Sequence, residues 1–419
     1  MLKTVKMATT DLDIGMYISG LDRPWLETPF VTQGFIIKSQ EELGRLREYC
    51  EFVYIDNRRS ARSAELLRQE ALQRRESSVE TKRAVDRPRV PIEKIFEGRV
   101  IKSYQDGSAW EEEHPRAQQA LNTLVGDIDQ IFSEVVDGDK LNVVKLRKSV
   151  EPVVDSISSN PDACLWVARL KQHDKYTYQH SLGAAIWSVS VGRHLGLQRQ
   201  DLRSLAMGCM LMDVGKLRLD PVLLQADREL TIEETAQVAS HVDHGMEILE
   251  ECGIINQDVI DIVAHHHERY DGSGYPNGMA HEQIPPFACI AGIVDTYDAI
   301  TSNRSYAPPV SPTEAIKLLY NLRDQDFQAE LVESFIQAIG IYPAGTLVEL
   351  SSGEVGVVVA EYRTRRLRPK IMLLLDSRKK KLRKTRIIDL QEESANASLT
   401  ITRSLEPEAY DIDLSKIAI

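Results

Sequence analysis

The sequence lacks long hydrophobic runs. No apolar stretch approaches the roughly 20 residues that a helix needs to span a bilayer. The first residues, Met1 to Lys6, are not followed by the hydrophobic core of a signal peptide. We therefore expect no membrane span and a cytoplasmic location.

Paired cysteines are also missing. The five cysteines are scattered and none forms a Cys-x-x-Cys pair, which excludes a zinc ribbon. Cys209 and Cys289 lie among apolar residues. Reduced, buried thiols are therefore expected rather than disulfides.

Positive charge is in the minority. Lys and Arg number 51 against 63 Asp and Glu, which gives a net charge of −12. This balance argues against a nucleic-acid polymer as a partner of the whole protein, although it does not exclude a local basic site. The 419 residues, with a hydrophobic share of 42%, are sufficient for two or three globular domains.

The first 58 residues have the pattern of a small α/β module. We expect strands at residues 11–18, 34–37 and 52–55. Ser39, with Glu42 three residues later, is typical of a helix start, and that helix is expected to end at Tyr49. No metal or nucleophile pattern occurs here. We expect a regulatory or interaction role for this module, with a purely structural role as the alternative.

The predicted fold class is a multidomain chain with a small α/β N-terminal module, a central all-α helical bundle and a small C-terminal antiparallel β appendage. Charged and small residues predict an exposed linker, and apolar residues at helical spacing predict the helices after it. The expected segments are a linker at 59–108, connecting helices at 109–160, the bundle at 161–341, the β appendage at 342–403 and a tail at 404–419.

The β appendage carries a basic segment. Strands are expected at residues 345–350, 356–360 and 370–375. Between Glu361 and Arg386 there are twelve Lys or Arg against two acidic residues. This segment could bind RNA, a polar partner or the acidic body of the protein, and a solvated basic edge is the alternative.

Six ionisable residues of the bundle point to a metal. Each lies on or beside a helix with an apolar face, where a lone instance is usually a satisfied core histidine or a capping aspartate. Buried carboxylates and imidazoles need partners, and a shared metal cluster satisfies all of them at once. The candidate ligands are His180, Asp213, His241, His266, His267 and Asp295.

A glycine-rich loop comes directly after the densest part of this set. After His265-His266-His267-Glu268 comes Asp271-Gly272-Ser273-Gly274-Tyr275-Pro276. Two glycines and a proline favour a tight, exposed loop whose backbone can approach a ligand. A helix that starts at Thr231, carries His241 and ends near Gly253 is expected to supply another of the candidate ligands.

Residues from about 161 to 341 resemble an HD-GYP domain, a bacterial subgroup of the HD metallophosphohydrolases. The order and spacing of the matching motifs agree with that family. The module at 1–58 resembles the uncharacterised domain often found in front of HD-GYP domains, and the β region resembles the C-terminal segment of such proteins. The matching motifs are Tyr176 to Ser181, Asp213-Val214-Gly215-Lys216, His241, His266 to Pro276, Asp295 to Ser302 and Arg304-Ser305-Tyr306.

The resemblance implies an HD-type bundle and a role for each motif. One metal would be held by His180, Asp213 and Asp295. Asp213 would bridge to a second metal, held also by His241, His266 and His267. Iron or manganese is typical of the family, and imidazole with carboxylate ligation permits either. The catalytic residues would be Asp213 and Lys216, and the substrate would contact Lys216, Gly274, Tyr275, Pro276, Asp298 and Arg304.

Three departures from the family pattern bear on activity. The histidine of the His-Asp pair is replaced by Met212, whose thioether suits neither iron nor manganese, so the first metal site is weakened. Tyr176 stands where members with a third metal carry glutamate, so two metals at most are expected. Ala307 stands where many members have a basic residue, which removes one phosphate contact.

Two interpretations of the function stay open. The first is a cyclic di-GMP phosphodiesterase that releases pGpG or GMP in bacterial second-messenger signalling. The second is a catalytically degenerate member that binds cyclic di-GMP or a protein partner as a receptor or scaffold, and it rests on Met212. A hydrolase for another nucleotide is disfavoured by the Gly-Tyr-Pro loop. Signalling-protein partners for the N-terminal module or the basic segment, and a homodimer, are also left open.

Overall fold

The computed structural model of the chain contains two compact units, Met1–Arg89 and Val90–Ile419. Each unit is described by itself. The described residues are 4–12, 14, 16–23, 35–37, 39–56, 89–170, 176–226, 228, 230–302, 309–362, 367–392, 399–406, 409–412 and 414.

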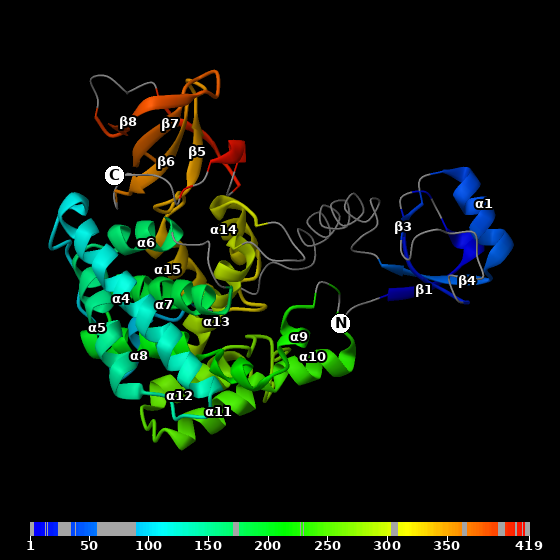
Figure 1. Cartoon of the computed structure of the whole chain (residues 1–419), viewed down its shortest axis with the longest axis horizontal. Helices are drawn as coiled ribbons and strands as arrows, with labels where there is room; N and C mark the ends of the chain where they lie inside the picture. Colours follow the sequence, from blue (N-terminus) through cyan, green and yellow to red (C-terminus); the bar gives the residue numbers. More distant parts are fainter. Residues whose placement is uncertain are drawn as a thin grey trace. The chain divides into compact units, whose positions relative to one another are not determined.

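The first unit contains a four-stranded sheet and one helix. The strands are β1 (Thr4–Ala8), β2 (Tyr17–Leu21), β3 (Phe35–Ile36) and β4 (Phe52–Asp56), and the sheet order is β1-β4-β2-β3 (Figure 1). Helix α1 (Gln40–Tyr49) starts as predicted, because the Ser39 side chain accepts a hydrogen bond from the Glu42 amide. The strand predicted at 11–18 is wrong in part. Residues Thr9–Asp11 form a 3-10 turn, and strand β2 begins only at Tyr17.

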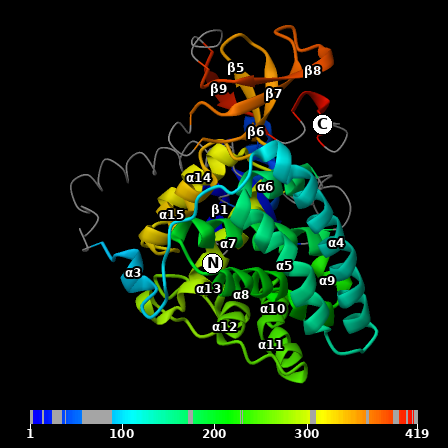
Figure 2. The same ribbon diagram turned by 90° about the vertical axis from the view of Figure 1, so that its left-hand side faces the viewer.

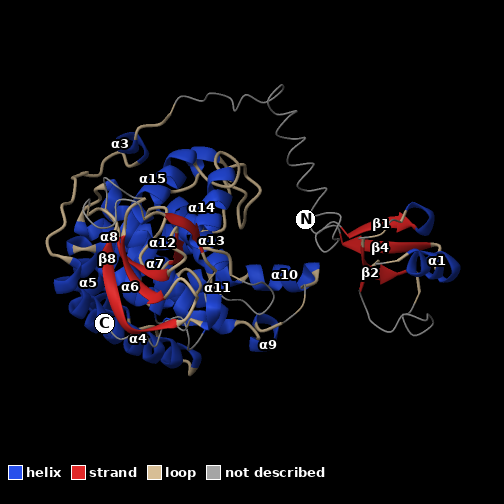
Figure 3. Ribbon diagram, turned by 90° about the horizontal axis from the view of Figure 1, so that it is seen from above, coloured by secondary structure: helices blue, strands red, loops and turns tan. Residues whose placement is uncertain are grey.

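The second unit is a helical body with a sheet attached (Figures 1 and 2). Figure 3 distinguishes its helices from its strands. No described helix is both long and apolar enough to cross a membrane. The helices are α3 (Ile92–Ile95), α4 (Trp110–Val136), α5 (Val143–Ser159), α6 (Pro161–Leu170), α7 (Tyr176–Leu195), α8 (Arg199–Leu211), α9 (Pro221–Leu224), α10 (Ile232–Ala239), α11 (His241–Glu251), α12 (Gln257–His265), α13 (Pro286–Thr301), α14 (Pro312–Asn321) and α15 (Ala329–Ile339).

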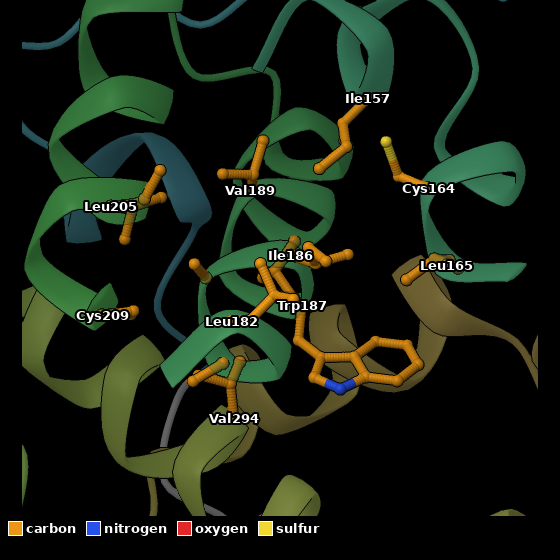
Figure 4. Close-up of a cluster of buried hydrophobic side chains, with 14 of the residues drawn as sticks. Ile157, Cys164, Leu165, Leu182, Ile186, Trp187, Val189, Leu205, Cys209 and Val294 are labelled. Atoms are coloured by element: carbon orange, nitrogen blue, oxygen red, sulfur yellow. The ribbon is translucent and has the colours of Figure 1, made fainter. Parts of the chain in front are cut away.

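Helix α7 lies inside the helical body. It packs against α8, α13 and α15, and its residues from Leu182 to Val191 are almost entirely buried. Figure 4 shows Ile186 and Val189 of α7 with Leu205 of α8 and Val294 of α13 in one apolar cluster. Burying a side chain of this size stabilises the fold by about 1.5–3 kcal/mol. The core therefore fixes the helices that carry the candidate ligands.

The C-terminal sheet has five antiparallel strands in the order β8-β7-β6-β5-β9. Alternate residues of β6 face opposite sides: Val357 joins the core of the helical body, whereas Val358 packs with Leu373 in a separate apolar cluster. The predicted fold class is confirmed, although β8 and β9 were not predicted. The strands are β5 (Leu347–Leu350), β6 (Val355–Ala360), β7 (Lys370–Leu375), β8 (Lys381–Asp389) and β9 (Ile401–Ser404).

Residues 90–108, here called the strap, lie along the helical body. The predicted linker of 59–108 is therefore shorter at its C-terminal end. The strap is held by backbone hydrogen bonds from Lys102 to the Gly196 carbonyl (2.8 Å) and from Gly107 to the Ser159 carbonyl (2.9 Å). No local sequence pattern indicates partners this distant along the chain. Residues 57–88 lie outside the described residues.

Arg99 fastens the strap to two helices. Its guanidinium forms ion pairs with Asp201 of α8 and Asp258 of α12, and its carbon Cζ lies 4.4 Å from the ring centroid of Phe287 of α13. Burial opposes the charge of Arg99, but the two carboxylates outweigh this effect and raise its pKa. One side chain thus joins the strap to three helices.

Replacing Arg99 by alanine is expected to lower the free energy of unfolding by about 1–2 kcal/mol, because two partly buried carboxylates lose their partner. Urea unfolding followed by tryptophan fluorescence would measure the change. Arg116→Ala is the matched control, since the side chain of Arg116 is 74% exposed and lies 3.7 Å from Glu113. Equal stability of the two variants would contradict the proposed role of Arg99.

Candidate metal centre

Four of the candidate ligands converge on one point. Asp213, His241, His266 and His267 each offer a ligand atom, and these atoms lie within 4.8 Å of one another. Asp213 follows α8, His241 opens α11, and the other two histidines follow α12. We call these four residues the cluster. Imidazole nitrogens with one carboxylate are a donor set that suits a divalent transition metal.

The boundary between two helices determines the position of His241. One helix was predicted to run from Thr231 through His241, and this prediction is wrong. Helix α10 ends at Ala239 and α11 begins at His241. Ser240 ends one helix and starts the next: its amide bonds to the Ala236 carbonyl, and its carbonyl accepts from the His244 amide. This boundary puts His241 in the first turn of α11, in contact with the residues after α8.

Gly215 allows α11 to approach Asp213. It lies in the 3-10 turn Val214–Arg218, which packs on the start of α11. A Cβ atom at Gly215 would lie 1.9 Å from the His241 carbonyl oxygen and 2.5 Å from the Gly245 amide nitrogen. Only glycine permits this approach of two backbones.

Backbone carbonyls orient the rings of two histidines. Nδ1 of His241 lies 2.7 Å from the Val238 carbonyl, and Nδ1 of His266 lies 3.1 Å from the Ile262 carbonyl. Protonated Nδ1 atoms donate these hydrogen bonds, so that each Nε2 presents its lone pair to the centre. Burial lowers the pKa of both rings, to about 4 for His266, and lowers the pKa of His267 as well. Neutral imidazoles of this kind are the form that binds metal.

The two carboxylate oxygens of Asp213 face different groups. Oδ1 lies 3.4 Å from Nε2 of His241 and 3.8 Å from Nε2 of His266. Oδ2 lies 2.7 Å from Nζ of Lys216 and 3.9 Å from Nε2 of His180. Burial opposes ionisation of Asp213, but its polar neighbours, with the positive charge of Lys216 as the largest influence, keep its pKa well below the usual range. Asp213 is therefore an anion between two groups of donors.

His180 and Asp295 lie beside the cluster and contact each other. Nε2 of His180 is 2.6 Å from Oδ1 of Asp295, and Nδ1 is 2.8 Å from Oδ2 of Asp298. Burial disfavours a charged ring, but the hydrogen bonds to both carboxylates outweigh it and raise the pKa of His180 to about 10. Burial would raise the pKa of Asp295, but the contact with His180 lowers it.

Asp298, which was predicted as a substrate contact, is buried beside His180. It is 4% exposed and accepts hydrogen bonds from His180, from Nε1 of Trp187 (3.3 Å) and from the Ser302 hydroxyl (3.3 Å). A buried carboxylate with these partners orients the His180 ring.

Sequence reasoning missed the part of α7 that accommodates Asp298. A Cβ atom at Gly183 would lie 2.3 Å from Oδ1 of Asp298, so glycine leaves room for the carboxylate. His180, Gly183 and Trp187 recur at i, i+3 and i+7, the spacing of one helix face. This spacing was the signal in the sequence that could have placed the three residues on the same side of α7.

The glycine-rich loop folds back onto the cluster. Glu268 is 4% exposed, and its carboxylate accepts hydrogen bonds from the Asn277 amide (2.8 Å) and the Met279 amide (3.0 Å). A Cβ atom at Gly274 would lie 2.3 Å from the Arg269 amide nitrogen. The Tyr275 ring stacks on His267, with centroids 4.6 Å apart, and the Tyr275–Pro276 peptide bond is cis. The role of Glu268 was not predicted. Arg304, a predicted phosphate contact, lies outside the described residues.

Family models match three segments of the chain. A model of the HD domain matches residues 157–331, and a model of a domain of unknown function matches residues 4–146. A model of the KOW domain associated with the HD domain matches residues 347–412. The candidate ligands all fall within the HD match.

Two phosphodiesterases and one solved structure resemble the chain. A cyclic di-GMP phosphodiesterase of Pseudomonas aeruginosa is 31% identical over 392 residues, which cover 93% of this chain and 89% of that protein. A 3'3'-cGAMP-specific phosphodiesterase of Vibrio cholerae is 28% identical over 196 residues, 46% of this chain and 36% of that protein. Among solved structures, an HDG"Y"P protein from Bdellovibrio bacteriovorus covers 79% of this chain and 97% of its own, with 17% identity and a TM-score of 0.43.

The similarity to the Pseudomonas protein extends over nearly the whole of both chains, so this chain belongs to the HD-domain family. Within that family it belongs to the HD-GYP subgroup, whose Gly-Tyr-Pro sequence is residues 274–276 here. The resemblance read from the sequence is thereby confirmed.

Proposed function

We propose that this protein is a metal-dependent phosphodiesterase that hydrolyses cyclic di-GMP to pGpG or GMP, and that it acts in bacterial signalling in the cytoplasm. The observation that carries the proposal is the convergence of Asp213, His241, His266 and His267 on one point. The activity for which the Pseudomonas relative is named, together with its similarity over 93% of this chain, supports the choice of substrate.

The cluster would hold an iron or manganese ion. When bound, a divalent ion polarises a phosphoryl oxygen and makes water acidic enough to act as a nucleophile near neutral pH. The chain supplies neutral imidazoles and an ionised carboxylate, which is the protonation state that such an ion requires.

Residues around the cluster would bind the substrate. Nζ of Lys216 lies 2.7 Å from Asp213, where its positive charge would neutralise a phosphate oxygen. The loop from Gly274 to Pro276 would shape the nucleotide pocket, with Tyr275 fixed by its stacking on His267. The guanidinium of Arg304 would contact a second phosphate oxygen.

Hydrolysis can be measured directly with the manganese-loaded full chain. Incubation with cyclic di-GMP, followed by chromatography, is expected to give pGpG, with 3'3'-cGAMP tested in parallel. His266→Ala should lose the activity. His244→Ala should keep it, since this matched histidine of α11 contacts Glu247 and not the cluster. Absence of product from both dinucleotides would contradict the enzyme proposal.

The second candidate function is a receptor that binds cyclic di-GMP without hydrolysing it. Met212, which stands in place of the usual histidine, is fully buried in the apolar core and favours this candidate. Retained binding of cyclic di-GMP without any product would establish it.

In either case, we propose signalling proteins as partners of the first unit and of the basic segment. Gel filtration would show whether the protein forms a homodimer.

A further inference from the structure

The spacing of the cluster matches that of ligands around one ion. Ligand atoms about 2.1 Å from a metal, at tetrahedral or octahedral angles, lie about 3.0–3.4 Å from one another. Nε2 of His241 is 3.4 Å from Nε2 of His266 and 3.4 Å from Oδ1 of Asp213. Nε2 of His266 is 3.8 Å from the same oxygen. These three residues therefore fit an ion with little adjustment, and the ligand atom of His267 lies within 4.8 Å of theirs.

The neighbouring group has a different spacing. The 2.6 Å between His180 Nε2 and Asp295 Oδ1 is a hydrogen-bond length, too short for two ligands of a common ion. Oδ2 of Asp213, the third donor on this side, accepts a hydrogen bond from Lys216 at 2.7 Å. Each of these three ligand atoms, which a second ion would need, therefore already contacts another side chain of the protein.

A further ligand for a second ion is missing because Met212 replaces the histidine of the family's His-Asp pair. This methionine directly precedes Asp213 and is 0% exposed within the apolar core. Its thioether is a soft, weak ligand for iron or manganese, which prefer nitrogen and oxygen. A second ion would have only three ligands here, namely His180, Asp295 and Oδ2 of Asp213. This is a small number of ligands, and the ion would also have to displace Lys216 from Asp213.

We propose that this centre holds a single divalent ion, bound by Asp213, His241, His266 and His267. In this arrangement Lys216, held against Oδ2 of Asp213, provides the positive charge on the side where a two-ion centre would have its second cation. A phosphate oxygen would then lie between the ion and the Lys216 ammonium group. The inference rests on the metal dependence in the proposed function, but it concerns the number of ions and not the reaction.

Elemental analysis of the manganese-loaded full chain tests the proposal. About one manganese per chain is expected, and His180→Ala should still bind about one. His266→Ala should bind none, and His244→Ala should match the unaltered protein. Two ions per chain that fall to one in His180→Ala would overturn the proposal, and so would an unaltered protein without manganese.

A spectroscopic measurement needs no variant and so does not depend on the folding of one. The paramagnetic resonance spectrum of the manganese-loaded protein should show the hyperfine pattern of an isolated ion. The spectrum of an exchange-coupled pair would overturn the proposal. Because neither readout requires turnover, an inactive protein with one ion would contradict the proposed function alone, and an active protein with two ions would contradict this inference alone.

Met212→His tests the cause of the missing site. Restoring an imidazole beside Asp213 is expected to raise the manganese content from about one towards two per chain, while Met212→Leu should leave it at about one. A count that stays at one in Met212→His would contradict the assignment of the missing site to this residue.

Discussion

Replacing Asp213 by asparagine is expected to release the bound ion and to lower kcat/KM for cyclic di-GMP by about 10³-fold. The amide keeps the size of the side chain but removes the negative charge that faces two histidines and Lys216. Two buried imidazole nitrogens, of His241 and His266, and the ammonium group of Lys216 would then face a neutral side chain. Elemental analysis and chromatography of the products measure the two effects.

The control for Asp213→Asn is Asp261→Asn on α12. Asp261 accepts a hydrogen bond from Gln257 on the protein surface, so this change removes the same charge without contacting the cluster. Its metal content and rate should remain those of the unaltered protein. If Asp213→Asn kept both its ion and its rate, the central role of Asp213 would be wrong.

Gly215→Ala is expected to lower the free energy of unfolding by about 3 kcal/mol and to abolish metal binding. The added methyl group would overlap the His241 carbonyl and the Gly245 amide, and backbone atoms cannot rotate away as a side chain can. The 3-10 turn would have to move off α11, which separates Asp213 from His241. Urea unfolding and elemental analysis measure these outcomes.

Gly126→Ala provides the matched control for this change. Gly126 lies in α4, and a Cβ atom built there meets nothing within 4 Å. Alanine at this position should stabilise the protein by about 0.5–1 kcal/mol through its helix propensity. Equal effects of the two substitutions would show that the close approach at Gly215 is unimportant.

Local signals in the sequence predicted local structure well. Ser39 with Glu42 and Thr231 with Glu234 mark helix starts because the contacts that cap a helix lie three residues apart. The prediction at His241 failed because the chain bends at Ser240, where both flanking segments favour a helix. Only the packing of α11 against the 3-10 turn shows where one helix ends and the next begins.

The candidate site was predictable in residue type but not in arrangement. Six ligand candidates could be named because charged and imidazole groups are unusual in apolar helices. The structure brings four of them together and pairs His180 with Asp295. The hydrogen bond between Trp187 and Asp298 was not predicted, because the two residues are 111 positions apart in sequence. No local pattern reports contacts of that range.

The strap bears on how short an independently folding piece of this protein can be. The HD match begins at residue 157, but α4 and α5 contribute Leu121, Ile128 and Val154 to the same core as α7. A fragment cut at residue 109 would keep these helices but would leave Asp201 and Asp258 without Arg99. The smallest fragment with every one of these contacts starts near Val90, where the backbone amide bonds to the Glu330 carboxylate of α15.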